Sequence, residues 1–268
     1  MGQPEPSDPF LGVVLALETA TRTGSVAIVQ AGRVIARTSG DGRTTHGERL
    51  PGEAVDLLTE NGLTVTDVDR FAVAVGPGSF TGLRVGIATI QGLALTRSRE
   101  VVGVSTLAAM AECVGAAGIE ADVLGIWLDG HRSEVFGVAY LTAGGEGARA
   151  ADATAPSVTV PPGLEELEPH CVGSATEVAT GWRGRIGRRS VALVGDGAVR
   201  YAGEAEAALG QAVRILAMPA ALAVGVGQLA VRATPAQRTA AHGVAPLYVR
   251  RPDAELARDR RARGVSSR

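Results

Sequence analysis

The stretch of this 268-residue chain that decides the fold is residues 71–95, which read FAVAVGPGSFTGLRVGIATIQGLAL. It predicts an apolar strand, a tight loop containing Gly76, Pro77 and Gly78, and a helix almost without charge. A glycine loop that opens a helix typically indicates phosphate, because free backbone N–H groups and the helix dipole both favour an anion there. The usual nucleotide signatures are missing, however. The spacing G-x-G-x-x-x-G is one residue too long for the dinucleotide fingerprint, and a chain without a single lysine cannot build a P-loop.

The predicted helix offers another explanation for its glycines. At about 100° per residue it presents two adjacent stripes, although a surface helix needs only one. The first stripe contains Leu83, Ile87, Ile90 and Ala94, and the second contains Gly82, Gly86, Thr89 and Leu93. Glycine inside a helix costs about 0.5–1 kcal/mol relative to alanine, so it is tolerated most easily where another backbone comes close. That neighbour is either a helix of the same chain or a helix of another chain.

Composition excludes several functional classes. A hydrophobic fraction of 46% is enough for large cores, and a net charge of −2 provides no basic field for extensive unaided binding of nucleic acid. The apolar run at residues 11–17 ends at Glu18 and is too short for a signal peptide or a membrane span. Two distant cysteines and four scattered histidines show no metal-site spacing. We therefore expect a cytoplasmic globular protein with no metal site and no membrane-spanning segment.

The first half of the chain has the element order βββαβαβα. Thr45 and Glu48 have the spacing of a capping box at the start of a helix. Pro51 lies either in the first turn of a later-starting helix or at a kink. Strands are predicted at residues 12–18, 24–30, 33–38, 71–75 and 101–104, and helices over 45–61, over the glycine segment and from Thr106.

The second half repeats this order more loosely. Strands are predicted near residues 123–129 and 134–141, a weak third strand around 148–153, and a short helix at 163–167. A strand at 191–194, a helix to about 209, a strand at 213–216 and a helix at 219–233 follow. The repeat predicts an α/β fold with two similar lobes. We assign residues 11–105 to the first lobe and 106–250 to a second, degenerate lobe whose last helix packs back on the first, with flexible extensions at 1–10 and 251–268 and a mobile insertion at 143–162.

The duplicated order resembles that of the actin-like, sugar-kinase and Hsp70-type ATPase fold. In that fold an acid at the end of the first strand of each lobe holds Mg²⁺ or positions a reactant, and the first hairpins wrap the phosphates. Glu18 and Asp129 stand at these positions, and Thr19 begins the first turn, so the three outline a degenerate nucleotide site. The second hairpin, residues 129–133, lacks a comparable set of hydroxyl groups and glycines.

Several motifs together resemble one family, TsaB, also called YeaZ. The specific element is GPGSFTGLRVG at residues 76–86, and the others, LALETATRTGSVAIV, THGERLPGEAVDLL, GVSTLAAMA, LDGHRSEVF, LVGDGAVRY and PLYVR, occur in the family's order. The resemblance implies a non-catalytic subunit that pairs with the paralogue TsaD and the ATPase TsaE. TsaD transfers a threonylcarbamoyl group to the adenosine beside the anticodon of tRNA. The resemblance also implies that the chain has no intrinsic cofactor and that ATP or ADP could bind at a subunit junction.

The resemblance further implies where a partner binds. The catalytic paralogue has an H-x-x-x-H metal motif on its first helix, whereas His46 here is followed at that spacing by Leu50, so His46 is expected to start a helix or to face a partner. First-lobe helices are expected to pack on those of TsaD, and the same face can form a homodimer. The expected interface residues are Leu50, Ala54, Leu57, Gly82, Leu83, Gly86, Ile87, Ile90 and Leu93.

Three other interpretations stay open at this point. The first is an ATP-binding phosphotransferase of the same fold, which would use Glu18 and Asp129. The second is a glycoprotease-type peptidase with Ser79 as nucleophile, although GPGSFTG is not the G-x-S-x-G elbow. The third is contact between tRNA and the tail at residues 250–268, where seven arginines face three acids, as against a solvated, partly disordered end.

Overall fold

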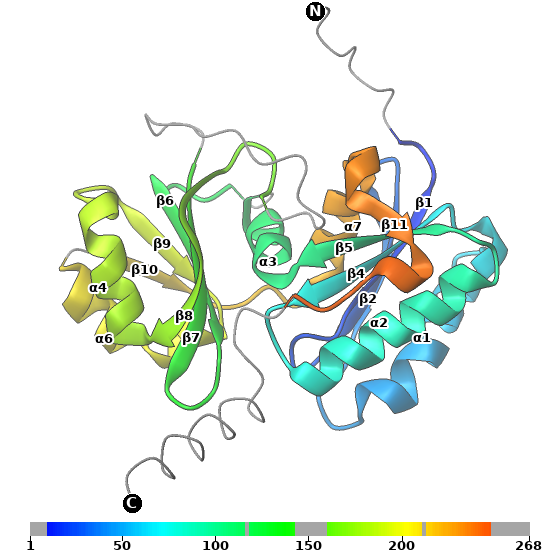
Figure 1. The fold of residues 1–268 in the computed structure, drawn as a ribbon, viewed down its shortest axis with the longest axis horizontal. Helices are drawn as coiled ribbons and strands as arrows, with labels where there is room; N and C mark the ends of the chain where they lie inside the picture. Colours follow the sequence, from blue (N-terminus) through cyan, green and yellow to red (C-terminus); the bar gives the residue numbers. More distant parts are fainter. Residues whose placement is uncertain (1–9, 116–117, 143–159, 211–212, 248–268) are drawn as a thin grey trace, which may run out of the picture.

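Two β-sheets, each with its own helices, make up the computed structural model, which describes residues 10–115, 118–142, 160–210 and 213–247 (Figure 1). The first sheet has the order β11-β5-β4-β1-β2-β3 and the second the order β10-β9-β6-β7-β8. The first contains β1 (Val13–Glu18), β2 (Ser25–Gln30), β3 (Arg33–Ser39), β4 (Arg70–Gly76), β5 (Glu100–Ser105) and β11 (Arg238–Ala240). The second contains β6 (Val123–Asp129), β7 (Glu134–Leu141), β8 (Glu165–Ser174), β9 (Val191–Val194) and β10 (Val213–Leu216).

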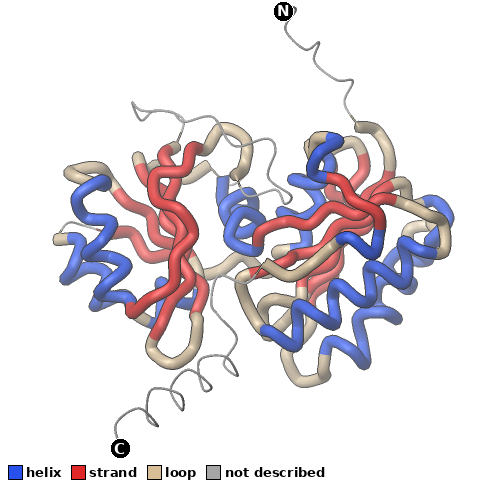
Figure 2. Tube along the Cα trace, in the orientation of Figure 1, coloured by secondary structure: helices blue, strands red, loops and turns tan. Residues whose placement is uncertain are grey.

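The two sheets share one topology. In each, a first strand pairs antiparallel with the second and parallel with the fourth, which gives β3-β2-β1-β4-β5 in one sheet and β8-β7-β6-β9-β10 in the other. Figure 2 shows the resulting pair of lobes, each with strands sandwiched between helices. The expected α/β actin-like fold with a duplicated order is confirmed.

Four helices cover the faces of the first sheet. Because side chains alternate along a strand, Leu15 and Leu17 of β1 face α1 (His46–Glu60) and α2 (Phe80–Leu95), whereas Val14 and Ala16 face α3 (Thr106–Gly115) and α7 (Ala223–Val231). Helix α3 also packs on the second sheet through Leu107 and Met110, so it lies between the lobes. Helix α7 packs on the first sheet and strand β11 is part of it, although both come from the second half of the sequence.

The local signals of the first half agree with the structure. Glu48 accepts hydrogen bonds from the Thr45 backbone N–H at 3.1 Å and hydroxyl at 2.6 Å, so the predicted capping box opens α1. The helix begins at His46 and Pro51 lies inside it. The remaining short helices are α5 (Asp196–Arg200), α6 (Ala202–Leu209), η1 (Val65–Asp67), η2 (Pro235–Gln237) and η3 (Ala241–Gly243).

The second half contains two errors of prediction. The prediction of a short helix at 163–167 is wrong, because β8, the edge strand of the second sheet, begins at Glu165. An edge strand tolerates Pro169 and a run of charges, which conceals the usual alternation. Helix α4 (Ala175–Ile186) was not predicted, although Ser174 and Glu177 form a capping box that could have revealed it.

Other expectations fall outside the described residues. These are the weak strand at 148–153, nearly all of the extension at 1–10, the extension at 251–268 and most of the insertion at 143–162. Within the described part of the chain, no helix has both the length and the apolar character needed to cross a bilayer.

Candidate functional site

A cleft of about 1210 Å³ lies where the turns of the two lobes meet. Its walls are the β1–β2 turn, the β3–α1 loop, the loop from β4 to α2, and the β6–β7 turn with Asp196 beside it. The resemblance to the actin-like fold places Glu18, Thr19 and Asp129 at this cleft.

Glu18 is turned into the protein instead of into the cleft. It is 1% exposed, and its carboxylate accepts hydrogen bonds from the Thr21 N–H at 2.7 Å, the Thr21 hydroxyl at 3.0 Å and the Ser25 hydroxyl at 3.4 Å. Burial raises the pKa of Glu18, and the hydrogen bonds from Thr21, Ala20 and Ser25 oppose that rise. Both carboxylate oxygens are therefore engaged within the turn.

Thr19 fills a notch in helix α2. It is fully buried, and a Cβ added to Gly82 would lie 2.0 Å from its carbonyl oxygen. A Cβ added to Gly86 would lie 2.2 Å from its hydroxyl oxygen. The glycines of this helix therefore allow close approach of a turn of the same chain, whereas the sequence led us to expect a helix of this chain or of another.

Asp129 of the second lobe is neutralised by its own lobe. Its carboxylate accepts a hydrogen bond from Arg200 at 2.7 Å and one from the His131 N–H at 3.0 Å. Asp196 alongside accepts the N–H groups of Asp129 and Gly197, both at 2.8 Å. Both acids expected in a nucleotide site therefore already accept hydrogen bonds from groups of their own lobe.

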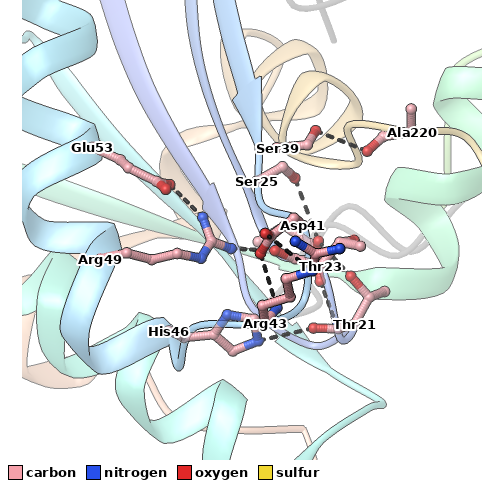
Figure 3. Close-up of polar contacts among 11 residues, drawn as sticks. Thr21, Thr23, Ser25, Ser39, Asp41, Arg43, His46, Arg49, Glu53 and Ala220 are labelled. Atoms are coloured by element: carbon pink, nitrogen blue, oxygen red, sulfur yellow. Dashed lines mark hydrogen bonds and ion pairs between the residues drawn. The ribbon is translucent and has the colours of Figure 1, made fainter.

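The N-terminal turn of α1 holds the other side of the β1–β2 turn. His46 Nε2 lies 2.9 Å from the carbonyl oxygen of Thr21, and Arg49 donates to the carbonyl oxygen of Thr23 and to the carboxylate of Glu53 (Figure 3). His46 is the first residue of α1, as the helix-start interpretation predicted. In the residues that the structure describes, no group of three or more His, Cys, Asp or Glu is arranged to bind a metal.

Ser79 has a structural position. It is the N-cap of α2, where its hydroxyl accepts the N–H of Gly82 at 3.2 Å and its own N–H donates to the carbonyl of Ala20 at 2.8 Å. Ser79 therefore joins α2 to the β1–β2 turn, with its side chain exposed at the cleft.

The structure places the expected interface residues largely inside the chain. Leu50, Ala54, Leu57, Gly82, Leu83, Gly86, Ile87 and Ile90 are buried in this chain, and Leu93 is half-buried against the same core. The first predicted stripe of α2 therefore faces the sheet, and Gly82 and Gly86 of the second stripe face the β1–β2 turn. Thr89 of the second stripe is half-exposed. A partner cannot reach the buried side chains without opening the first lobe.

A third stripe of α2 is the one that solvent reaches. Gly47 of α1 lies beside Val85 of α2, and several exposed or half-exposed positions of both helices are small and uncharged. We call this surface the α1–α2 seam. It consists of Gly47, Pro51 and Val55 on α1 and Val85, Ala88, Thr89 and Gly92 on α2, all of them exposed or half-exposed. The sequence signal for the seam is the absence of charge at these positions.

Comparisons with known proteins agree with this architecture. The profile of the family described as "TsaD: tRNA N6-adenosine threonylcarbamoyltransferase" matches residues 41–258. The Escherichia coli tRNA threonylcarbamoyladenosine biosynthesis protein TsaB is 34% identical over 188 residues, which are 69% of this chain and 80% of that protein. TsaB of Haemophilus influenzae is 38% identical over 99 residues, or 37% of this chain and 42% of that protein.

Solved structures give the same result. A Pseudomonas aeruginosa protein described as having similarity to peptidase YEAZ superposes with a TM-score of 0.69 at 26% identity, covering 89% of this chain and 100% of that one. The shared fold, the extended identity to TsaB and the matching profile point the same way, and the chain belongs to the TsaB (YeaZ) family.

Proposed function

We propose that this chain is a non-catalytic partner subunit required for threonylcarbamoylation of the adenosine next to the anticodon in tRNA. It acts by binding and activating the catalytic paralogue TsaD, together with the ATPase TsaE. Such a role on tRNA places it in the cytoplasm. The observation that carries the proposal is the α1–α2 seam, supported by the names of the relatives in threonylcarbamoyladenosine biosynthesis.

The seam suits a helix-on-helix contact. Its side chains are small, so a second pair of helices can approach closely, and ridges of one pair can enter the grooves of the other. Val55 of the seam is 42% exposed, and burial of its apolar surface would favour association. A homodimer through the same seam is the expected alternative when TsaD is absent.

The cleft supports the non-catalytic part of the proposal. Glu18 is engaged by hydrogen-bond donors of its own turn and Asp129 by Arg200, so nucleotide chemistry would have to displace internal contacts first. ATP or ADP at a junction with another subunit stays a prediction, since the partner would supply the remaining ligands.

The first experiment is assembly with TsaD from the same organism, followed by light scattering. Val55→Arg introduces a charge into the seam and is expected to abolish the heterodimer and the tRNA modification by the reconstituted complex. Val199→Arg is the matched control, because Val199 is 54% exposed on α5 of the other lobe. The proposal fails if both variants assemble equally well with folding intact.

Two rival activities have direct assays. Micromolar binding of ATP and Mg²⁺ by calorimetry, abolished by Glu18→Ala or Asp129→Ala, would favour a phosphotransferase. Hydrolysis of a peptide that disappears in Ser79→Ala would favour a peptidase. We expect neither activity from the purified chain.

A further inference from the structure

The β1–β2 turn has the donors of an anion site, and the side-chain carboxyl group of Glu18 already accepts them. The N–H and hydroxyl of Thr21 and the hydroxyl of Ser25 converge on the carboxylate of Glu18, which is 1% exposed. Convergent backbone and hydroxyl donors of this kind favour a negatively charged acceptor.

The surroundings of the turn leave few other uses for these donors. Ser25 accepts the N–H of Ala223 at 3.0 Å, at the start of α7, so its own hydrogen is directed at Glu18. The carbonyl groups of the turn are occupied separately, those of Thr21 and Thr23 by His46 and Arg49. Hydrogen-bond donors therefore contact the Glu18 side chain on the inner side of the turn. On the outer side, nitrogen atoms of His46 and Arg49 contact the backbone carbonyl groups of the turn.

We propose that Glu18 is an internal anion that occupies the anion-binding position of the β1–β2 turn and thereby seats Thr19 in the Gly82–Gly86 notch of α2. The carboxylate takes the place that a phosphate or carboxylate ligand would take in an empty turn of this shape. Wild-type protein is therefore closed to a small anion at this position, and removal of the side chain opens a site for one.

The seat of Thr19 connects this turn to the partner surface. The residue follows Glu18 directly, and its carbonyl and hydroxyl oxygens fit where Gly82 and Gly86 have no side chains. Glu18 is in this way a positioning residue for α2, whose outer stripe is half of the α1–α2 seam. Only this last consequence rests on the proposed function.

The test is chemical rescue by formate, the smallest carboxylate. Glu18→Ala should lower the midpoint of thermal unfolding by several degrees, and sodium formate should raise it again in a saturable way relative to sodium chloride at equal ionic strength. At about twenty times its dissociation constant, a ligand that binds only folded protein shifts the unfolding equilibrium about 20-fold. Wild type should show no such response, because its site is filled.

Leu17→Ala is the matched control. Leu17 is the neighbouring fully buried residue of β1, but it points into an apolar cluster with Val73 and Ile87, so its cavity has no donors for formate. A rescue that is equal in Leu17→Ala, or absent in Glu18→Ala, overturns the proposal.

Glu18→Gln is the second test, for use if Glu18→Ala does not fold. The amide NH2 group of the new glutamine is a donor and cannot accept hydrogen bonds from Thr21 or Ser25. The Glu18→Gln protein should therefore be clearly less stable than wild type, and equal stability would also overturn the proposal.

Assembly with TsaD separates the two hypotheses. Loss of the complex in Glu18→Ala and its return with formate would link the turn to the seam. Rescue of the unfolding midpoint, with no complex even for wild type, would refute the proposed function and leave the internal anion standing.

Discussion

Adding one methyl group to Gly82 tests how α2 is held. The new Cβ would lie 2.0 Å from the Thr19 carbonyl oxygen, whereas ordinary contact begins at 3.4 Å, so α2 and the turn must separate by about 1.4 Å. Overpacking of this kind costs about 1–3 kcal/mol. Helix propensity returns about 1 kcal/mol, so Gly82→Ala should lower the free energy of unfolding by up to about 2 kcal/mol.

The same helix contains its own control. Gly92 has open space around its Cα, so Gly92→Ala should gain about 0.5–1 kcal/mol from helix propensity alone. Urea unfolding should be followed by circular dichroism, because both tryptophans of the chain, Trp127 and Trp182, pack in the core of the second lobe. A Gly82→Ala protein as stable as Gly92→Ala would refute the notch between α2 and the turn.

Three further predictions concern charge and helix ends. Burial lowers the pKa of His170 to about 4 from its ordinary value of 6.5. Between these two values the unfolded chain binds a proton that the folded protein does not. The contribution of His170 to the free energy of unfolding is therefore fully present above pH 6.5 and is lost as pH falls towards 4. Urea titrations at pH 7.5 and 5 should differ by about 2 kcal/mol from this source, a difference that His170→Asn removes and that the exposed-site control His131→Asn retains. Ser79→Ala, which removes the N-cap of α2, should cost about 1 kcal/mol in the same titration at neutral pH, and no measurable cost would contradict the cap. Arg70 is buried and donates to the carbonyl oxygens of Ala230 at 2.7 Å and Val231 at 3.3 Å, so Arg70→Met should cost about 2 kcal/mol and accelerate hydrogen exchange at the end of α7; unchanged exchange there would contradict this role.

Local signals in the sequence were sufficient for most of the fold. The capping box at Thr45, the glycine loop before α2 and the repeated strand order each depend on residues close together in the chain, and all appear in the structure. The failure at β8 has a physical cause, whereas α4 was missed although the capping box of Ser174 and Glu177 could have revealed it. An edge strand needs only one neighbour and tolerates a charged run such as EELEPH, so alternation in that segment is too weak to read.

The candidate site was predicted less well than the fold. Sequence periodicity showed that α2 has two faces suited to close packing, but both could equally meet another chain. The same ambiguity applied to Glu18, since a carboxylate at the end of the first strand can point into a cleft or back into its own turn.

The amino-acid sequence by itself determined the element types, their duplicated order, the family and the uncharged character of the seam, because these depend on local propensity, spacing and composition. Only the tertiary structure decided that Thr19 occupies the glycine notch, that Arg200 neutralises Asp129 and that the predicted interface residues lie in the chain's own core. The physical reason is that each of these outcomes depends on a contact between segments far apart in the chain. Periodicity can show that a face must be covered, but it does not specify which segment covers it.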